Sequence, residues 1–190
     1  VIGGQVTSPS FTMATTDRVA GKTPAAATFS FTTTAGGALA TSSTITLTYP
    51  SGFFTTSAGT LGATISGGAT GTMVAPTATQ IVITITAGTI AASTAVTVTV
   101  TGRTMGSATA GGDITIATSA DQTASAGAAS GVIGGQPTSP SFTMATADRV
   151  AGKTPAAATF SFTPTAGGVL ATSSTITLTY PSGFFTTSAG

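Results

Sequence analysis

The run TITLTYPSGF, residues 44–53, carries the clearest structural signal in this chain. Its first six residues alternate between hydroxyl and apolar side chains, and this period of two is typical of a β-strand with one buried face. The proline, serine and glycine that follow favour a tight turn. The run therefore predicts a short strand that turns Ile45, Leu47 and Tyr49 toward a core and ends at a sharp corner.

The same alternation recurs along the chain. Threonine, valine and isoleucine dominate these segments, and β-branched side chains favour a pleated strand. Further strands are expected at residues 11–13, 29–31, 61–65, 72–74, 81–85, 96–100 and 114–116, and residues 123–131 predict a linker or a loose edge strand. No segment shows a helical period. We therefore predict an all-β fold, an antiparallel β-sandwich of about seven to nine short strands per repeat.

An internal repeat organises the chain. Residues 1–59 recur as residues 132–190, and the copies differ only at Val6/Pro137, Thr16/Ala147, Thr33/Pro164 and Ala38/Val169. The period has the size of a domain and is too long for a solenoid coil. We expect residues 1–131 to form a complete sandwich and residues 132–190 a partial second repeat, completed by continuation of the chain or by a neighbouring subunit. A domain boundary near residue 60 is the alternative, and the chain is expected to be a window from a longer tandem array.

The composition excludes several classes of function. Charged residues make up 5% of the chain, the net charge is +1, and cysteine, histidine, tryptophan, glutamate and asparagine are all missing from the sequence. Disulfides, cysteine or histidine catalysis and N-linked glycosylation need residues that the chain lacks. Five scattered basic residues do not form a nucleic-acid footprint. We therefore expect no enzyme activity, no cofactor, no metal site and no nucleic-acid partner.

The segments 28–32 (TFSFT) and 44–53 resemble the tandem β-sandwich repeats of large microbial surface and adhesin-type proteins. Such repeats often carry a strand, a Pro-x-Gly corner and a core phenylalanine in this order, here ending at Phe53. The resemblance implies an immunoglobulin-like sandwich with an extracellular structural or adhesive role. It brings no catalytic residues, and the aspartate clusters that bind calcium in many such repeats are absent from this sequence.

The charged residues gather in one short segment. Residues 15–22 contain Asp17, Arg18 and Lys22, and the segment recurs in the second copy. It predicts either a solvated loop, because exposed ion pairs contribute little stability, or a salt bridge that fixes the angle between repeats. Asp113 and Asp121 stand alone in the sequence, and we expect both to be solvated loop charges.

The junction between the copies is the candidate interaction site. Scarce charges predict unprotected sheet edges, which favour pairing with a neighbouring strand. The segment that opens the second copy is expected to cross the boundary and dock on the preceding domain. The candidate inter-repeat contact residues are Val132, Ile133, Phe142 and Met144.

These observations predict a structural, extracellular tandem-repeat protein that forms a filament, stalk or surface layer at the cell surface. Its partners would be identical repeats or subunits, joined by sandwich contacts and possible donor-strand pairing, with O-linked glycans on serine and threonine. No apolar run is long enough to span a membrane. The alternative is an adhesin-type, carbohydrate-binding or ice-binding module that uses outward threonine faces, such as Thr44, Thr46 and Thr48 or Thr97 and Thr99.

Overall fold

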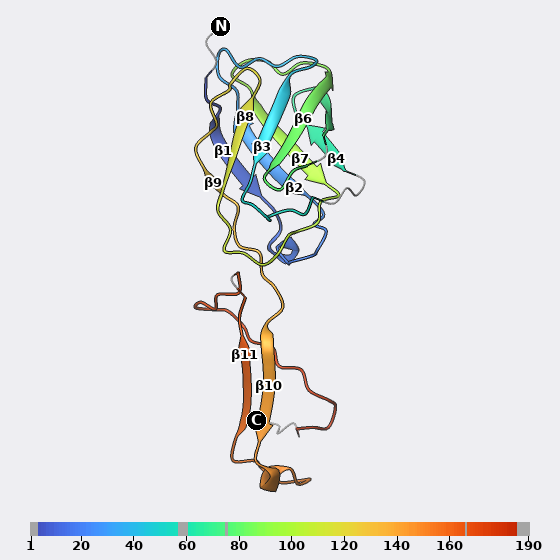
Figure 1. Cartoon of the computed structure of the whole chain (residues 1–190), viewed down its shortest axis with the longest axis vertical. Coiled ribbons are helices and arrows are strands. Elements are labelled where there is room, and N and C mark those ends of the chain that lie inside the picture. Colours follow the sequence, from blue (N-terminus) through green and yellow to red (C-terminus); the bar gives the residue numbers. More distant parts are fainter. Residues whose placement is uncertain (1–3, 57–60, 75, 166, 186–190) are drawn as a thin grey trace.

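Two antiparallel sheets pack face to face in the computed structural model, which describes residues 4–56, 61–74, 76–165 and 167–185 (Figure 1). The first sheet has the order β1-β2-β7-β4, with strands Thr7–Thr12, Ala27–Thr32, Ala95–Thr101 and Gly62–Ile65. The second sheet has the order β5-β6-β3-β8-β9, with strands Thr70–Met73, Gln80–Ala87, Thr44–Thr48, Asp113–Thr118 and Ala128–Ala129. A 3₁₀ turn, η1 (Thr15–Asp17), follows β1. The prediction of an all-β, antiparallel architecture is confirmed.

The period-two pattern places the core between the two sheets. In β3, Ile45 and Leu47 are fully buried, while the threonines between them are partly exposed. In the register of β2 with β7, Phe29 lies opposite Val98, and both are buried. The other fully buried aromatic and aliphatic side chains include Phe31, Leu39, Phe53, Phe54, Ile81, Ile83, Ile85, Val100, Met105, Ile114 and Ile116.

The outer strands of the first sandwich are protected against pairing with further strands, although they carry few charges. β1 carries Pro9 and a bulge between Thr7 and Ser10, which interrupts its pairing with β2. The remaining outer strands are short, with four residues each in β4 and β5 and two in β9. Proline, bulges and short length all discourage strand addition. The expectation of unprotected edges is therefore wrong for this sandwich.

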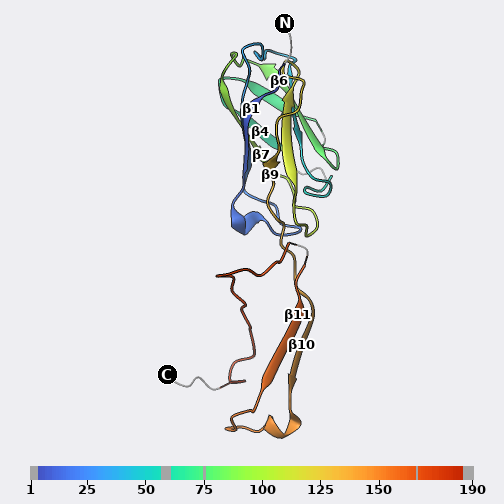
Figure 2. The same cartoon turned by 90° about the vertical axis from the view of Figure 1, so that its left-hand side faces the viewer.

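The second copy forms a hairpin, β10 (Thr138–Met144) with β11 (Ala158–Thr163), and a second 3₁₀ turn, η2 (Thr146–Asp148). Its register repeats that of β1 with β2, because Ser141 pairs with Ser161 as Ser10 pairs with Ser30. Figure 2 shows the segment after β11 standing away from the hairpin.

Identical sequence adopts different structures in the two copies. Residues 44–48 form β3 between β6 and β8, whereas the same five residues at 175–179 form no strand. Ile45 is fully buried, but its counterpart Ile176 is 57% exposed. In the described part of the second copy, residues 175–179 have no strand on either side. A strand needs backbone partners, and its sequence pattern alone does not supply them.

Two of the four differences between the copies fall at buried positions of the first sandwich. Val6 belongs to the core, and Thr33 is buried beside the loop before β7. The Thr33 N–H donates to Thr94 O (3.0 Å), and its hydroxyl accepts from the Thr94 N–H (3.0 Å). Pro164, its counterpart, has no N–H and no hydroxyl. A proline at this position therefore cannot form the two hydrogen bonds that Thr33 makes with Thr94.

Candidate inter-repeat junction

Ile133 joins the two copies, because it lies in the second copy but is buried in the core of the first. Its side chain is fully buried and belongs to the same apolar cluster as Phe53 and Met105. Its backbone exchanges two hydrogen bonds with Thr109, from Thr109 N–H to Ile133 O (3.1 Å) and from Ile133 N–H to Thr109 O (2.9 Å). The apolar core of the first sandwich therefore reaches the second residue of the second copy, which starts at residue 132.

The next residue is held on the opposite side. Gly134 N–H donates to Arg18 O (3.0 Å), and Ala20 N–H donates to Gly134 O (2.9 Å). The chain thus leaves the first sandwich between two segments, one at Thr109 and one at residues 18–20. Four backbone hydrogen bonds on two sides restrict the directions in which the second copy can point.

Arg18 adds a side-chain contact at the same place. Its guanidinium donates to the carbonyl of Ser130 and lies 5.7 Å from the centre of the Phe11 ring. Gly131 has a positive φ of 75°, and a Cβ at this residue would collide with the Arg18 guanidinium. The positive φ favours glycine at residue 131, and a larger residue there would also displace the Arg18 guanidinium.

Close backbone approach at two glycines of the second copy completes the junction. Gly167 lies far along the second copy, yet its Cα faces the carbonyls of Ile133 and Thr109 so closely that a Cβ would overlap the Ile133 carbonyl. A Cβ on Gly135 would lie 2.9 Å from the Ala108 methyl group. Two glycines of the second copy thus permit backbone approach at the base of the first.

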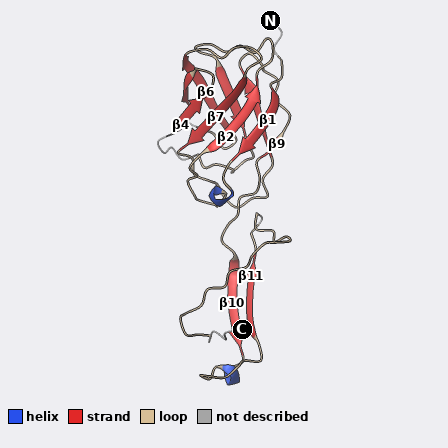
Figure 3. Ribbon diagram, turned by 180° about the vertical axis from the view of Figure 1, so that it is seen from behind, coloured by secondary structure: helices blue, strands red, loops and turns tan. Residues whose placement is uncertain are grey.

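The loop that supplies Arg18 is braced by an ion pair. Lys22 Nζ lies 2.9 Å from Asp17 Oδ1, and Asp17 Oδ2 accepts from the Ala25 N–H (3.0 Å). Figure 3 shows η1, which ends at Asp17, at the end of the sandwich that faces the partial repeat. The ion pair lies within the loop and does not bridge the repeats. Asp17 is buried, so the expectation that it is a solvated charge is wrong.

Low pH is expected to weaken the interactions of Asp17 with Lys22 and Ala25. The Lys22 ammonium, and after it the Ala25 N–H, hold the pKa of the Asp17 carboxyl below its ordinary value of 3.8. A lowered folded-state pKa stabilises the fold above pH 3.8, and this contribution is lost as the pH falls through the folded pKa. Asp17→Asn should therefore flatten the pH dependence of unfolding below pH 3.8, measured by urea titrations across that range. An unchanged pH profile would contradict the assignment.

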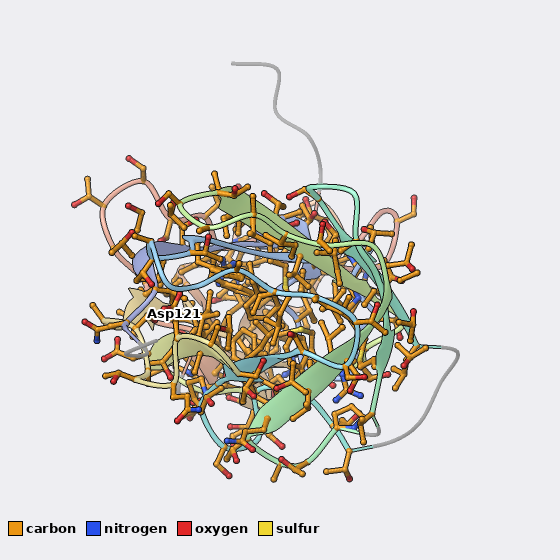
Figure 4. The ribbon with its side chains drawn as sticks, turned by 90° about the horizontal axis from the view of Figure 1, so that it is seen from above. Asp121 is labelled. Carbon is orange, nitrogen blue, oxygen red and sulfur yellow. The ribbon has the colours of Figure 1, made fainter. Side chains whose placement is uncertain are left out.

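A buried carboxylate organises the opposite end of the first sandwich, which Figure 4 views from above. Asp121 is fully buried, and its carboxylate accepts from Gly4 N–H (3.2 Å), Thr34 N–H (3.0 Å) and the Thr34 hydroxyl (2.5 Å). A Cβ on Gly37 would collide with the same carboxylate. The expectation that Asp121 is a solvated charge is therefore wrong, whereas Asp113 is exposed as expected.

Arg103 is a further buried charge. Its side chain is fully buried, donates to the carbonyl of Thr55 and lies 5.5 Å from the centre of the Phe54 ring. Burial lowers the pKa of the Arg103 guanidinium and raises the pKa of the neighbouring Tyr49 hydroxyl. Both shifts report the cost of charge in an apolar environment.

The sequence-based candidates separate into two groups. Ile133 reaches the first sandwich, and its neighbour Val132 is 46% exposed. Phe142 and Met144 lie in β10, where both are partly buried. Phe142 stacks on Phe160 of its own copy, with 4.8 Å between the ring centres, and Met144 pairs with Ala158 of β11. Sequence reasoning missed Thr109, Gly167 and the backbone role of Arg18. Of these missed residues only Arg18 had a sequence signal, because it lies in the charged segment 15–22.

The junction is built from backbone hydrogen bonds and one buried apolar side chain. Among the residues that the structure describes, no three acidic side chains gather as a metal site would require. The same part of the chain contains no helix of the length and hydropathy that crossing a bilayer needs. Comparison with protein-family models, with curated proteins and with solved structures finds no match to this chain. The functional argument therefore depends on the geometry of the junction itself.

Proposed function

We propose that this chain is a structural, extracellular tandem-repeat protein whose sandwiches join end to end into a filament, stalk or surface layer. The observation that carries the proposal is the burial of Ile133 in the core of the preceding sandwich. A linker between independent domains is normally exposed and makes few contacts. A junction with a core side chain and backbone bonds on both sides instead transmits force and direction from one repeat to the next.

The composition supports the same role. A surface of hydroxyl and methyl groups with 5% charged residues offers few sites for specific charge recognition. The chain has no cysteine whose oxidation could damage it outside the cell. O-linked glycans on the many serine and threonine hydroxyls would keep such a surface soluble, and this modification belongs to the proposal.

We further propose an immunoglobulin-like topology with one added hairpin. The strand order β1-β2-β7-β4 corresponds to strands A, B, E and D of an immunoglobulin constant-type domain. The order β9-β8-β3 corresponds to its strands G, F and C. The hairpin β5-β6 lies between the fourth and fifth of these strands in the sequence and extends the second sheet beyond β3. Tandem arrays suit this topology, because the chain enters and leaves at opposite ends of the sandwich.

Electron microscopy of a chain with several complete repeats tests the proposed function. We expect straight or regularly curved rods in which successive sandwiches meet at one angle. A flexible string of beads with a broad distribution of angles would overturn the proposal.

A second candidate function is favoured by one feature of the first sheet. Its strand register aligns hydroxyl side chains in a row across all four strands, namely Thr12, Thr28, Thr99 and Thr64. A second row contains Ser10, Ser30 and Thr97. This charge-free face fits a hydroxyl-rich ligand, either a carbohydrate or ice. Glycan or ice affinity that Thr99→Lys abolishes would support this function, and its absence in the unaltered chain would exclude it.

A further inference from the structure

A groove in the partial repeat matches a site that is filled in the first repeat. The groove has a volume of about 810 Å³ and is lined by Phe142 and Met144 and by the segments 148–155 and 183–185. The corresponding residues of the first repeat are Phe11, Met13, 17–24 and 52–54, and there the segment 103–106 of the same repeat is hydrogen-bonded to the segments 21–22 and 53–55.

Backbone hydrogen bonds fix how that segment is held. Met105 N–H donates to Lys22 O (2.8 Å), and Gly21 N–H donates to Met105 O (3.2 Å). On the opposite side of the site, formed by residues 52–54, Gly106 N–H donates to Phe53 O (2.9 Å). The Met105 side chain is fully buried, so it anchors the segment in the apolar centre of the site.

The strand before this segment pairs with the counterpart of β11. In the first repeat, β7 lies beside β2 over its whole length, from Ala27 opposite Val100 to Thr32 opposite Ala95. β11 has the sequence of β2 but pairs only with β10 in the described residues, so its other edge is open. The open edge and the groove thus lie where one continuous segment, β7 followed by residues 102–106, is bound in the first repeat.

The partial repeat already holds the aromatic geometry of the filled site. The rings of Phe184 and Phe185 are 4.9 Å apart at 88°, against 4.9 Å and 82° for Phe53 and Phe54. The Tyr180–Phe185 pair and its counterpart in the first repeat both lie 5.1 Å apart at 84°. A preorganised acceptor loses less entropy when its ligand binds.

We propose that the open edge of β11 and this groove form an acceptor site for a donor segment with the sequence of residues 94–106, supplied by a further copy of the repeat. The donor adds as a strand to β11, with Val96, Val98 and Val100 over the apolar face, and inserts Met105 into the groove. This inference deepens the proposed function, because it names the segment through which repeats complete one another.

A synthetic peptide of residues 94–107 tests the proposal on the full chain. Calorimetry should show one peptide bound per chain, because the site in the first repeat is already filled by its own residues. Hydrogen exchange should slow at Phe160 and Phe162, while Phe29 and Phe31, their identical counterparts, serve as unchanged internal references. A peptide with Met105→Asp should bind at least about tenfold more weakly, since it would bury an unpaired charge.

A tethered version covers the case of weak binding in solution. The same peptide joined through a flexible linker after Gly190 acts at a high effective concentration. Protection at Phe160 and Phe162 in either format supports the site. No protection in both formats, two peptides per chain, or equal binding of the Met105→Asp peptide would overturn it. The rod shape of a multi-repeat chain does not depend on this peptide, so failure here is distinguishable from failure of the proposed function.

Discussion

Replacing Ile133 with alanine is expected to lower the free energy of unfolding of the first sandwich by about 2–5 kcal/mol. The side chain lies fully buried in the apolar cluster of that sandwich, so truncation removes apolar contacts and leaves a cavity. Urea unfolding followed through the NMR signals of Val98 reports on this sandwich specifically. The unusual feature is that a residue of the second copy would control the stability of the first.

Val132→Ala is the matched control. Val132 precedes Ile133 in the sequence but is 46% exposed, so its truncation should change the stability by no more than about 0.5 kcal/mol. Equal effects of the two substitutions would mean that Ile133 is a linker residue without a core contact. The two repeats would then not be structurally continuous through Ile133.

Replacing Asp121 with alanine should destabilise the first sandwich by about 2–4 kcal/mol. The change leaves the Gly4 N–H, the Thr34 N–H and the Thr34 hydroxyl without the carboxylate that accepts their hydrogen bonds. Buried donors without a partner carry their full desolvation cost. Thermal unfolding by calorimetry measures the loss, and hydrogen exchange at Thr34 locates it.

Asp113→Ala provides the comparison within the same region of the sequence. Asp113 begins β8 and is exposed, so its removal should change the unfolding free energy by about 0.5 kcal/mol or less. A similar loss from both substitutions would show that net charge, and not the buried hydrogen bonds of Asp121, determines the effect.

The strands could be predicted from the sequence because their signal is local. The alternation in residues 44–49, and its equivalents elsewhere, depends on side chains two positions apart. Strand positions and the buried face of β3, β6 and β7 follow directly from it. The same rule failed at residues 175–179, because strand formation also needs partners that a local pattern does not contain.

The junction could be predicted only in part. Burial of Ile133 and its pairing with Thr109 depend on contacts between segments far apart in the sequence, and the loop glycines carry no pattern that marks them as close-packed. Asp121 was misjudged for a related reason. An isolated aspartate in a sequence gives no sign of the backbone N–H groups that surround it after folding.

Hydrogen exchange at the Ile133 amide tests most directly whether successive repeats are structurally continuous. The amide donates to Thr109 O inside the first sandwich, so we predict that it exchanges only through global unfolding, at the rate of the central amides of β7. Exchange at the rate of an unstructured peptide, while the β7 amides remain protected, would contradict the account and make residue 133 part of a flexible tether.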